Sequence, residues 1–169
     1  MRTIIFFLFF LPIFCCAQNA NVFIKILDAK GQQINGESVT KGFEKWIQAT
    51  STGSAAKNNT TFNFTMPVGG ASADLKKAMA ADEFLMKAEV AAVAPSSYTG
   101  LLVYTIKMEQ VKVLSCSESM GCNNVMNTTV SLQATRIGWT YYTQGRTGAT
   151  TVSRKFGWDA EKQIEWINF

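Results

Sequence analysis

Apolar and polar residues alternate with a period of two along most of this chain. Successive side chains of a β-strand point to opposite faces, so the alternation predicts strands that each have one buried face. The alternating stretches are residues 22–27, 43–50, 62–66, 84–90, 102–108, 111–115, 130–141 and 152–158. We expect a tight bend near Gln110, and a shared buried face for Phe84, Met86, Ala88 and Val90. So many short strands predict a mainly β fold, either a sandwich or a small closed β-barrel of two sheets.

One segment follows the period of an α-helix instead. Leu75, Ala78 and Met79 recur at intervals of three and four residues, which places them in one apolar stripe. Ser72 is a favourable N-cap residue, and Asp74 would lie in the first turn, where a negative charge suits the helix dipole. We therefore expect one short α-helix whose stripe covers the barrel.

The first residues have the layout of a secretory signal peptide. Arg2 carries a positive charge, residues 4–14 are apolar, and small residues precede Gln18. A membrane span needs about 20 apolar residues, so no stable membrane insertion is expected. The sequence predicts cleavage between Ala17 and Gln18, which makes residues 1–17 a signal peptide.

The rest of the chain, residues 18–169, is predicted to be a single domain that is exported to the periplasm or the medium. The alternative is a lipoprotein that is acylated at Cys15 or Cys16, but the preceding residues, Phe14 and Cys15, do not suit such a site. Without residues 1–17 the net charge is +3 instead of +4. This charge is too small and too scattered for a nucleic-acid-binding surface.

Cys116 and Cys122 are the cysteines that remain after cleavage of the signal peptide. An even number of cysteines in an exported chain indicates a disulfide. Their spacing does not match a redox C-x-x-C motif, and the chain has no histidine that would complete a zinc site. We predict a disulfide that closes a short loop and contributes about 2 kcal/mol. Two free thiols are the alternative.

The residues that most enzymes use are missing or scattered. Histidine, the commonest general base, is absent from the sequence. Asp82 and Glu83 are adjacent, and neighbours in a strand point to opposite faces, so they do not form a paired-carboxylate site. The sequence therefore predicts no catalytic residue, no cofactor and no metal site. Four Asn-x-Thr sequences carry no weight, because they arise readily by chance in a polar, strand-rich chain; they start at Asn58, Asn59, Asn63 and Asn127.

Three blocks of the sequence carry a resemblance to a known family. The first is VFIKILDAKGQQINGESVTKGFEKWIQA, residues 22–49, with its turn at Gly36, Glu37 and Ser38. The second is FTMPVGGASADLKKAMAADEFLMKAEV, residues 64–90, continued by LLVYTIKMEQVKVLSCS, residues 101–117. The third is VSLQATRIGWTYYTQGRTGATTVSRKFGWDAEKQ, residues 130–163. In order and spacing these blocks resemble the haemolysin-coregulated protein (Hcp) family, the tube subunit of the bacterial type VI secretion system.

The resemblance implies a small β-barrel with one helix at its side, six copies of which pack into a ring. Rings of the family stack into a tube, and the lumen can hold small effector proteins. Self-association and effector binding are therefore the expected interactions, and no enzyme activity is expected. Trp46, Met66 and Trp158 are candidate interface residues, with core packing as the alternative for each.

The sequence departs from the family at four points. Tube subunits normally lack a signal peptide, and many members have a long Gly-rich arm where this chain has the short SAAKNN stretch. The aromatic-rich end of the family's second strand is replaced by ATSTG, residues 49–53, and the family lacks the cysteine pair. A second hypothesis is therefore a monomeric periplasmic or secreted β-barrel that binds a protein or a small ligand. A deep apolar cavity inside one subunit would favour that hypothesis.

Overall fold

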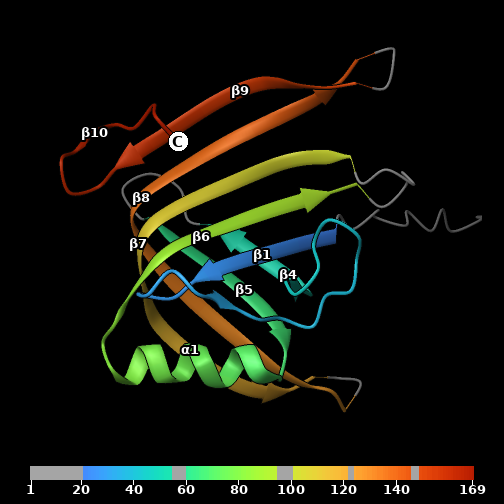
Figure 1. Ribbon diagram of the computed structural model, residues 1–169, viewed down its shortest axis with the longest axis vertical. Helices are drawn as coiled ribbons and strands as arrows, with labels where there is room; N and C mark the ends of the chain where they lie inside the picture. Colours follow the sequence, from blue (N-terminus) through green and yellow to red (C-terminus); the bar gives the residue numbers. More distant parts are fainter. Residues whose placement is uncertain (1–20, 55–59, 95–100, 122–123, 146–148) are drawn as a thin grey trace, which may run out of the picture.

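The protein is described here from a computed structural model, which covers residues 21–54, 60–94, 101–121, 124–145 and 149–169 (Figure 1). The predicted signal peptide, its cleavage site, Asn58, Asn59 and Cys122 lie outside the described residues. The strands are β1 (Asn21–Leu27), β2 (Gln33–Ile34), β3 (Ile47–Ala49), β4 (Ser51–Ser54), β5 (Thr61–Pro67), β6 (Phe84–Val93), β7 (Leu102–Met120), β8 (Met126–Gln144), β9 (Thr150–Asp159) and β10 (Ile164–Glu165), and the helix is α1 (Gly70–Ala80).

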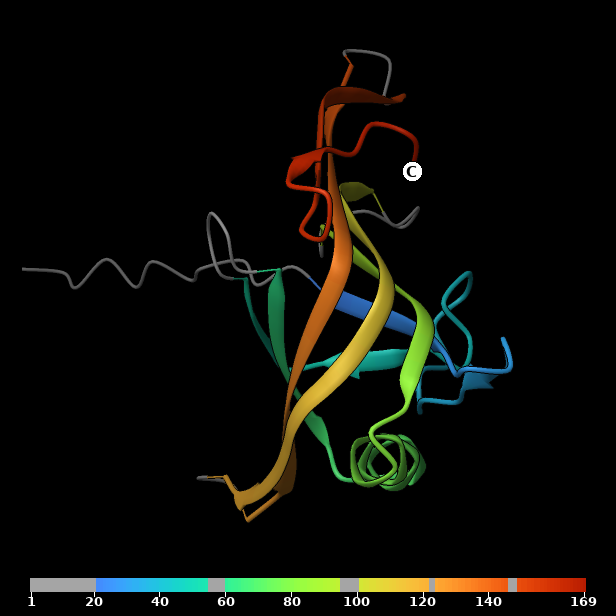
Figure 2. The same cartoon turned by 90° about the vertical axis from the view of Figure 1, so that its left-hand side faces the viewer.

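The two longest strands, β7 and β8, organise the whole fold. They are antiparallel and pair along nearly their full length, from Tyr104 opposite Tyr141 to Met120 opposite Met126. The first half of β8 also pairs with β5, and its second half pairs with β9. The first half of β7 pairs with β6, which in turn pairs with β1. One bent sheet therefore faces itself across the core, with α1 at one end and β9 at the other (Figures 1 and 2).

The mainly β fold with one helix is confirmed for the described residues, but closure of the barrel is not. The hydrogen-bonded path of strands is open and runs β10-β9-β8-β7-β6-β1-β2. Residues 47–54 connect its two sides, because β3 pairs with β1 and the next strand, β4, pairs with β5. Between them the Thr50 amide donates a hydrogen bond of 2.8 Å to the Thr65 carbonyl.

A bend at Gln110 changes which residues of β7 are buried. Gln110 has a φ of 50°, and Met108 before it and Val111 after it both face the core. The partner strands shift in the same way, so that Leu85 of β6 is buried together with Ala88. The predicted bend is thus confirmed. The predicted face of β6 is wrong at its start, where Phe84 and Met86 are exposed.

The strand predicted over residues 43–50 is mostly a loop. Lys45 has a φ of 62°, which interrupts any strand, and only Ile47–Ala49 pair with β1. The loop packs on the outer face of β1, where the Phe43 ring stacks on Phe23 with 4.5 Å between ring centroids. The aromatic residues of this segment therefore cover β1 instead of extending the sheet.

Helix α1 has the predicted stripe but begins earlier than predicted. Gly69 is the N-cap, and Ser72 lies inside the first turn, where its hydroxyl accepts a hydrogen bond of 3.2 Å from the Gly69 amide. Asp74 consequently lies beyond the first turn, which contains no acidic residue. Leu75 and Ala78 are buried against the core, as expected from the stripe.

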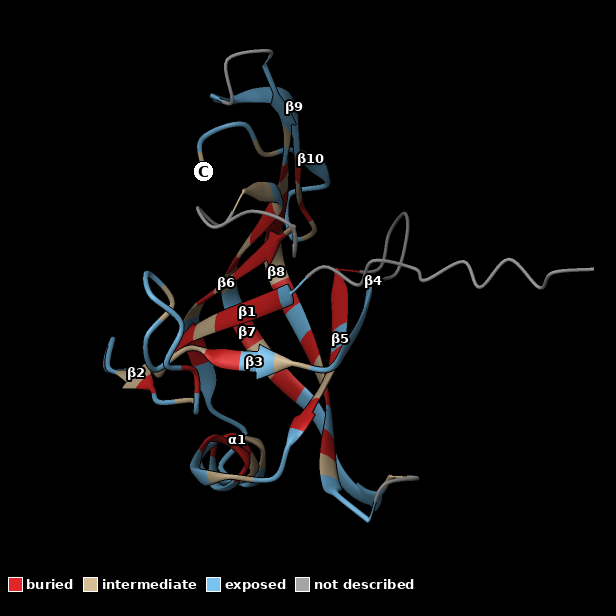
Figure 3. Ribbon diagram, turned by 90° about the vertical axis from the view of Figure 1, so that its right-hand side faces the viewer, coloured by how far each residue is buried: buried red, intermediate tan, exposed pale blue. Residues whose placement is uncertain are grey.

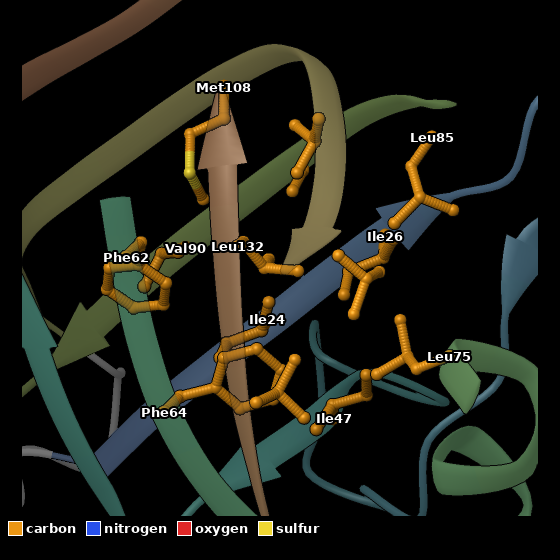
Figure 4. Packing of buried hydrophobic residues seen from close by; sticks show 14 of the residues in the cluster. Ile24, Ile26, Ile47, Phe62, Phe64, Leu75, Leu85, Val90, Met108 and Leu132 are labelled. Atoms are coloured by element: carbon orange, nitrogen blue, oxygen red, sulfur yellow. The ribbon is translucent and has the colours of Figure 1, made fainter. Parts of the chain in front are cut away.

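A single cluster of buried apolar residues lies between the two halves of the bent sheet and α1 (Figure 3). Ile24 and Ile26 of β1 face Phe62 and Phe64 of β5, with Leu132 of β8 between them (Figure 4). The predicted burial of Phe62, Phe64 and Met66 on one face of β5 is confirmed. Each such side chain contributes roughly 1.5–3 kcal/mol on burial, so this cluster holds the two halves together.

Candidate self-assembly surface

Part of the sheet extends away from the core, and no other strand or helix of the described residues covers the face of it that continues from the core. We call this part the projecting region: residues 102–107 of β7, 137–144 of β8 and 150–158 of β9. In Figure 2 it is seen edge-on as a thin layer that rises away from α1. The residues of β9 from Thr150 to Phe156 are all exposed. Strands with little buried surface are marginally stable alone, so this region is where a partner would add most.

Aromatic residues gather on the face of the projecting region that continues from the core. Tyr104 and Tyr141 are cross-strand partners with 6.2 Å between their rings, and Trp139 stacks on Phe156 at 5.6 Å. Tyr141 is 46% exposed and Phe156 is 48% exposed. Tyr104, Trp139 and Tyr141 also line a hollow of about 220 Å³ between the projecting region and the β4–β5 hairpin. We use the term aromatic face for the four residues Tyr104, Trp139, Tyr141 and Phe156. Such exposed aromatic groups are typical of interaction surfaces.

The opposite face carries a row of paired charges. Arg136 of β8 lies between Glu109 of β7 and Asp159 of β9, its direct partners in the two ladders. Its guanidinium contacts Glu109 Oε2 at 3.0 Å and Asp159 Oδ2 at 3.2 Å. Asp159 is only 4% exposed, and its other oxygen accepts a hydrogen bond of 2.9 Å from the Lys162 amide. This row fixes β9 and the chain after it to the rest of the sheet.

A pair of glycines follows on the same face. Gly138 and Gly157 are cross-strand partners, and the Phe169 ring lies over both. A methyl group added at Gly138 would lie 2.6 Å from Cζ of this ring, and one added at Gly157 would lie 2.7 Å from Cε1. Glycine weakens the interior of a strand, and here its presence is explained by the close approach of the ring.

Strand β9 is an edge of the sheet. The short strand β10 pairs only with its last two residues, Trp158 and Asp159. Within the described part of the chain, no strand pairs with the outer side of residues 150–156. An unpaired edge of this length presents backbone donors and acceptors to a neighbouring molecule.

The structure separates the three predicted interface residues. Met66 is 2% exposed and packs in the core, which is the alternative role stated for it above. Trp46 is partly buried in the loop over β1, where its ring edge meets Phe43 and Lys25 lies over it. Trp158 is partly buried in the projecting region, opposite Ile137. Only Trp158 therefore belongs to the surface described above.

The sequence reasoning missed the aromatic face and the glycine pair. The alternation predicts strands for Tyr104 and Trp139, but the exposure of their face depends on how far β8 and β9 extend beyond the core. The glycine pair did leave a signal, because Gly138 and Gly157 each interrupt an aromatic-rich strand pattern. The reason for the two glycines is the contact with Phe169, which follows Gly157 by twelve residues in the sequence and could not be placed from the pattern alone.

The predicted disulfide is not found. Cys116 is a free, partly buried thiol, and burial raises its pKa, with an opposing effect of Lys76 and a further increase from Glu118. Strand β7 continues past Cys116 to Met120, and the Gly121 amide donates a hydrogen bond to the Val125 carbonyl. Cys122, the predicted partner, lies outside the described residues. The pairing stays a prediction, checked by counting thiols in the denatured, unreduced protein.

Two larger hollows lie at the surface of the described residues. One, of about 610 Å³, is bordered by Phe84, Lys112 and Glu161, and the other, of about 500 Å³, by Glu37, Met66 and Gly69. Among the described side chains, no group of three or more His, Cys, Asp or Glu residues could hold a metal ion. None of the helices in that part of the chain has the length and apolar character needed to cross a membrane.

Comparisons with known proteins agree with this architecture. The chain matches the family described as type VI secretion system effector, Hcp, over residues 23–141, which is more than half of its length. A comparison with curated proteins found no match.

Solved structures with the same fold include Hcp1 from Salmonella typhimurium, with a TM-score of 0.71 and 20% sequence identity, covering 88% of this chain and 99% of that chain. Another is an Hcp1 protein from the E. coli EAEC 042 pathovar, with a TM-score of 0.64 and 21% identity, covering 79% and 97%. A third, described as a type six secretion system protein, has a TM-score of 0.74 and 18% identity, covering 87% and 99%.

The mainly β fold and the match over residues 23–141 identify the chain as a type VI secretion system protein. The chain belongs to the Hcp family of type VI secretion system effectors. This is a structural family rather than a family of enzymes.

Proposed function

We propose that the mature chain, residues 18–169, is an exported structural protein that assembles from six copies into a ring, and that the ring holds small effector proteins in its lumen. Membership of the Hcp family supports self-assembly. The observation that carries the proposal is the projecting region, with its uncovered aromatic face and the unpaired edge of β9.

The chemistry of the projecting region suits contact between identical copies. Tyr141 and Phe156 are each about half exposed, and Tyr141 also lines a hollow, so these two rings offer apolar area that a neighbour can bury. Aromatic residues supply much of the binding energy in interfaces because they bury a large area with few rotatable bonds. The charged row on the other face is already paired within the chain, so it needs no partner to neutralise it.

Export would follow from the signal-peptide pattern of residues 1–17, and it would place the protein outside the cytoplasm. We propose that it functions in the periplasm or the medium as a type VI tube component or an exported relative of one. Secretion of a tagged full-length chain, with N-terminal sequencing of the released protein, tests this part. A released protein that begins at Gln18 supports it, and retention of residues 1–17 contradicts it.

The assembly is tested by native mass spectrometry and electron microscopy of residues 18–169 over a range of concentrations. We expect a hexamer, seen as rings. Replacing Tyr141 and Phe156 together with serine should shift the population to monomers. The matched control is Val39→Ser, because Val39 is 92% exposed but lies in the loop outside the projecting region. Monomers alone at high concentration would contradict ring assembly, and an unchanged ring in the double variant would exclude the aromatic face as its interface.

A further inference from the structure

The segment that follows β10 lies across the projecting region as an ordered strap. Strand β10 pairs with the end of β9, and the Trp166 amide then donates a hydrogen bond of 3.0 Å to the Gly157 carbonyl. Phe169 covers the glycine pair, and the Trp166 ring packs against it at 4.9 Å. The strap thus adds one hydrogen bond at the outer edge of β9 after β10, and then turns over the face of the sheet at the glycine pair.

Lys155 holds the end of the strap from two directions. Its ammonium group donates a hydrogen bond of 2.7 Å to the main-chain oxygen of Phe169 and lies 4.1 Å from the centre of the Phe169 ring. Both contacts favour an aromatic residue whose main-chain oxygen points toward β9. Lys155 is opposite Thr140 and one step along the ladder from the glycine pair.

We propose that Gly138, Gly157 and Lys155 form a peptide-binding site on the edge of β9, and that the strap of residues 164–169 is its resident ligand. The chemical class of ligand is an extended peptide with an aromatic side chain. Main-chain hydrogen bonds to β9 supply general affinity, and the flat surface over the two glycines supplies selectivity for a ring. This is the usual division of roles when a peptide adds a strand to a sheet edge.

The two glycines leave room for an aromatic ring, because neither has a side chain that would occupy the position of the ring. The nearest atoms to a methyl group at Gly138 all belong to the Phe169 ring: Cε2, Cζ and Cδ2. At Gly157 the nearest are the Trp166 main-chain oxygen and the same ring. Any larger residue at either position would therefore displace the ring, while the paired strands beneath it would keep their register.

The bound segment is held by few contacts other than these. Ile164 and Ile167 are exposed, and β10 has only two residues. The affinity of the segment therefore depends mainly on the Trp166 amide, the Phe169 ring and Lys155. Because the segment is part of the same chain, its effective concentration at the site is in the mM range, so a free peptide will not compete with it.

The test uses a chain that ends at Glu165, which keeps β10, and a synthetic peptide of the removed residues, Trp-Ile-Asn-Phe, blocked at both ends. Binding is followed by the amide signals of Gly138, Gly157 and Lys155 in two-dimensional NMR of the ¹⁵N-labelled protein. We expect the truncation to move these signals and the added peptide to move them back toward their full-length positions. The same peptide with Phe replaced by Ala should bind at least tenfold more weakly, and the full-length protein should show no response.

Gly138→Ala in the truncated chain separates the binding site from the fold. In that chain the Phe169 atoms nearest to the new methyl group are gone, so the variant should fold and lose peptide binding. Gly53→Ala is the matched control, because Gly53 also lies in a strand but a methyl group there meets nothing within 4 Å.

The proposal is overturned by any of three results: signals of the glycine pair that are the same with and without residues 166–169, no response of the truncated chain to the peptide at mM concentration, or equal binding by the Gly138→Ala variant. These readouts are made within one chain, so they do not depend on whether the protein forms rings.

Discussion

Replacing Arg136 with methionine should destabilise the protein by about 2–3 kcal/mol, because it leaves the buried Asp159 carboxylate without its cation. Removal of one partner of a buried ion pair generally costs about 3–5 kcal/mol. Two features place this case at or below the lower limit of that range. Asp159 keeps its hydrogen bond from the Lys162 amide, and the Nε atom of Arg136 lies 3.2 Å from Asp159 without a well-aligned hydrogen bond. Methionine retains most of the apolar stem, so little packing is lost.

Glu109→Gln provides the comparison, because it removes the other partner of Arg136. The Glu109 side chain is 37% exposed, and such partly exposed pairs contribute less than about 1 kcal/mol. Both variants are measured by urea unfolding of residues 18–169. The m-value, which is the slope of the unfolding free energy against urea concentration, is expected to stay unchanged. Adding Asp159→Asn to Arg136→Met should recover part of the loss, since no unpaired charge then remains. A loss from Arg136→Met no larger than that from Glu109→Gln would refute the reasoning.

Three further predictions concern α1, the bend and the thiol. Leu75→Ala should cost about 2–5 kcal/mol in urea unfolding, because Leu75 is fully buried between α1 and the core; a loss below about 1 kcal/mol would mean that the helix is not packed as described. Gln110→Gly should leave stability unchanged or raise it by about 1 kcal/mol in the same assay, since a φ of 50° is unfavourable for glutamine, whereas a clear loss would show that the Gln110 side chain contributes. Burial raises the pKa of the Cys116 thiol, so alkylation by iodoacetamide in the reduced protein, followed by mass spectrometry, should set in at higher pH than for a free cysteine. The folded state favours the neutral thiol, so this contribution to stability is present below the unfolded-state pKa and is lost as the pH rises through the folded-state pKa; alkylation at the pH of a free thiol would contradict it.

The strands were predictable where alternation is strict and local. The pattern of β5, the bend near Gln110 and the extension of β8 through Trp139 to Tyr141 all follow from the residues themselves. Family resemblance was also confirmed, because the order of three long blocks is a more specific signal than any one motif.

The errors occurred where tertiary contacts decide the outcome. Phe84 and Met86 have the alternation of a buried face, but the bend in the neighbouring β7 turns that part of β6 outward. The residues near 43 have the pattern of a strand, yet Phe43 is used to cover Phe23. The start of α1 was placed at Ser72 because Ser is a good N-cap, whereas the chain uses its hydroxyl on the Gly69 amide and on Thr128, 2.9 Å away.

Strands β7 and β8 belong to both halves of the molecule, so in the part of the chain that the structure describes no boundary divides one half from the other. A force applied to the β8–β9 end therefore acts on β7 and β8, which also form the end of the sheet next to α1. We expect these described elements to unfold in a single step, and a ring built from such subunits would transmit axial force through continuous strands instead of through flexible joints.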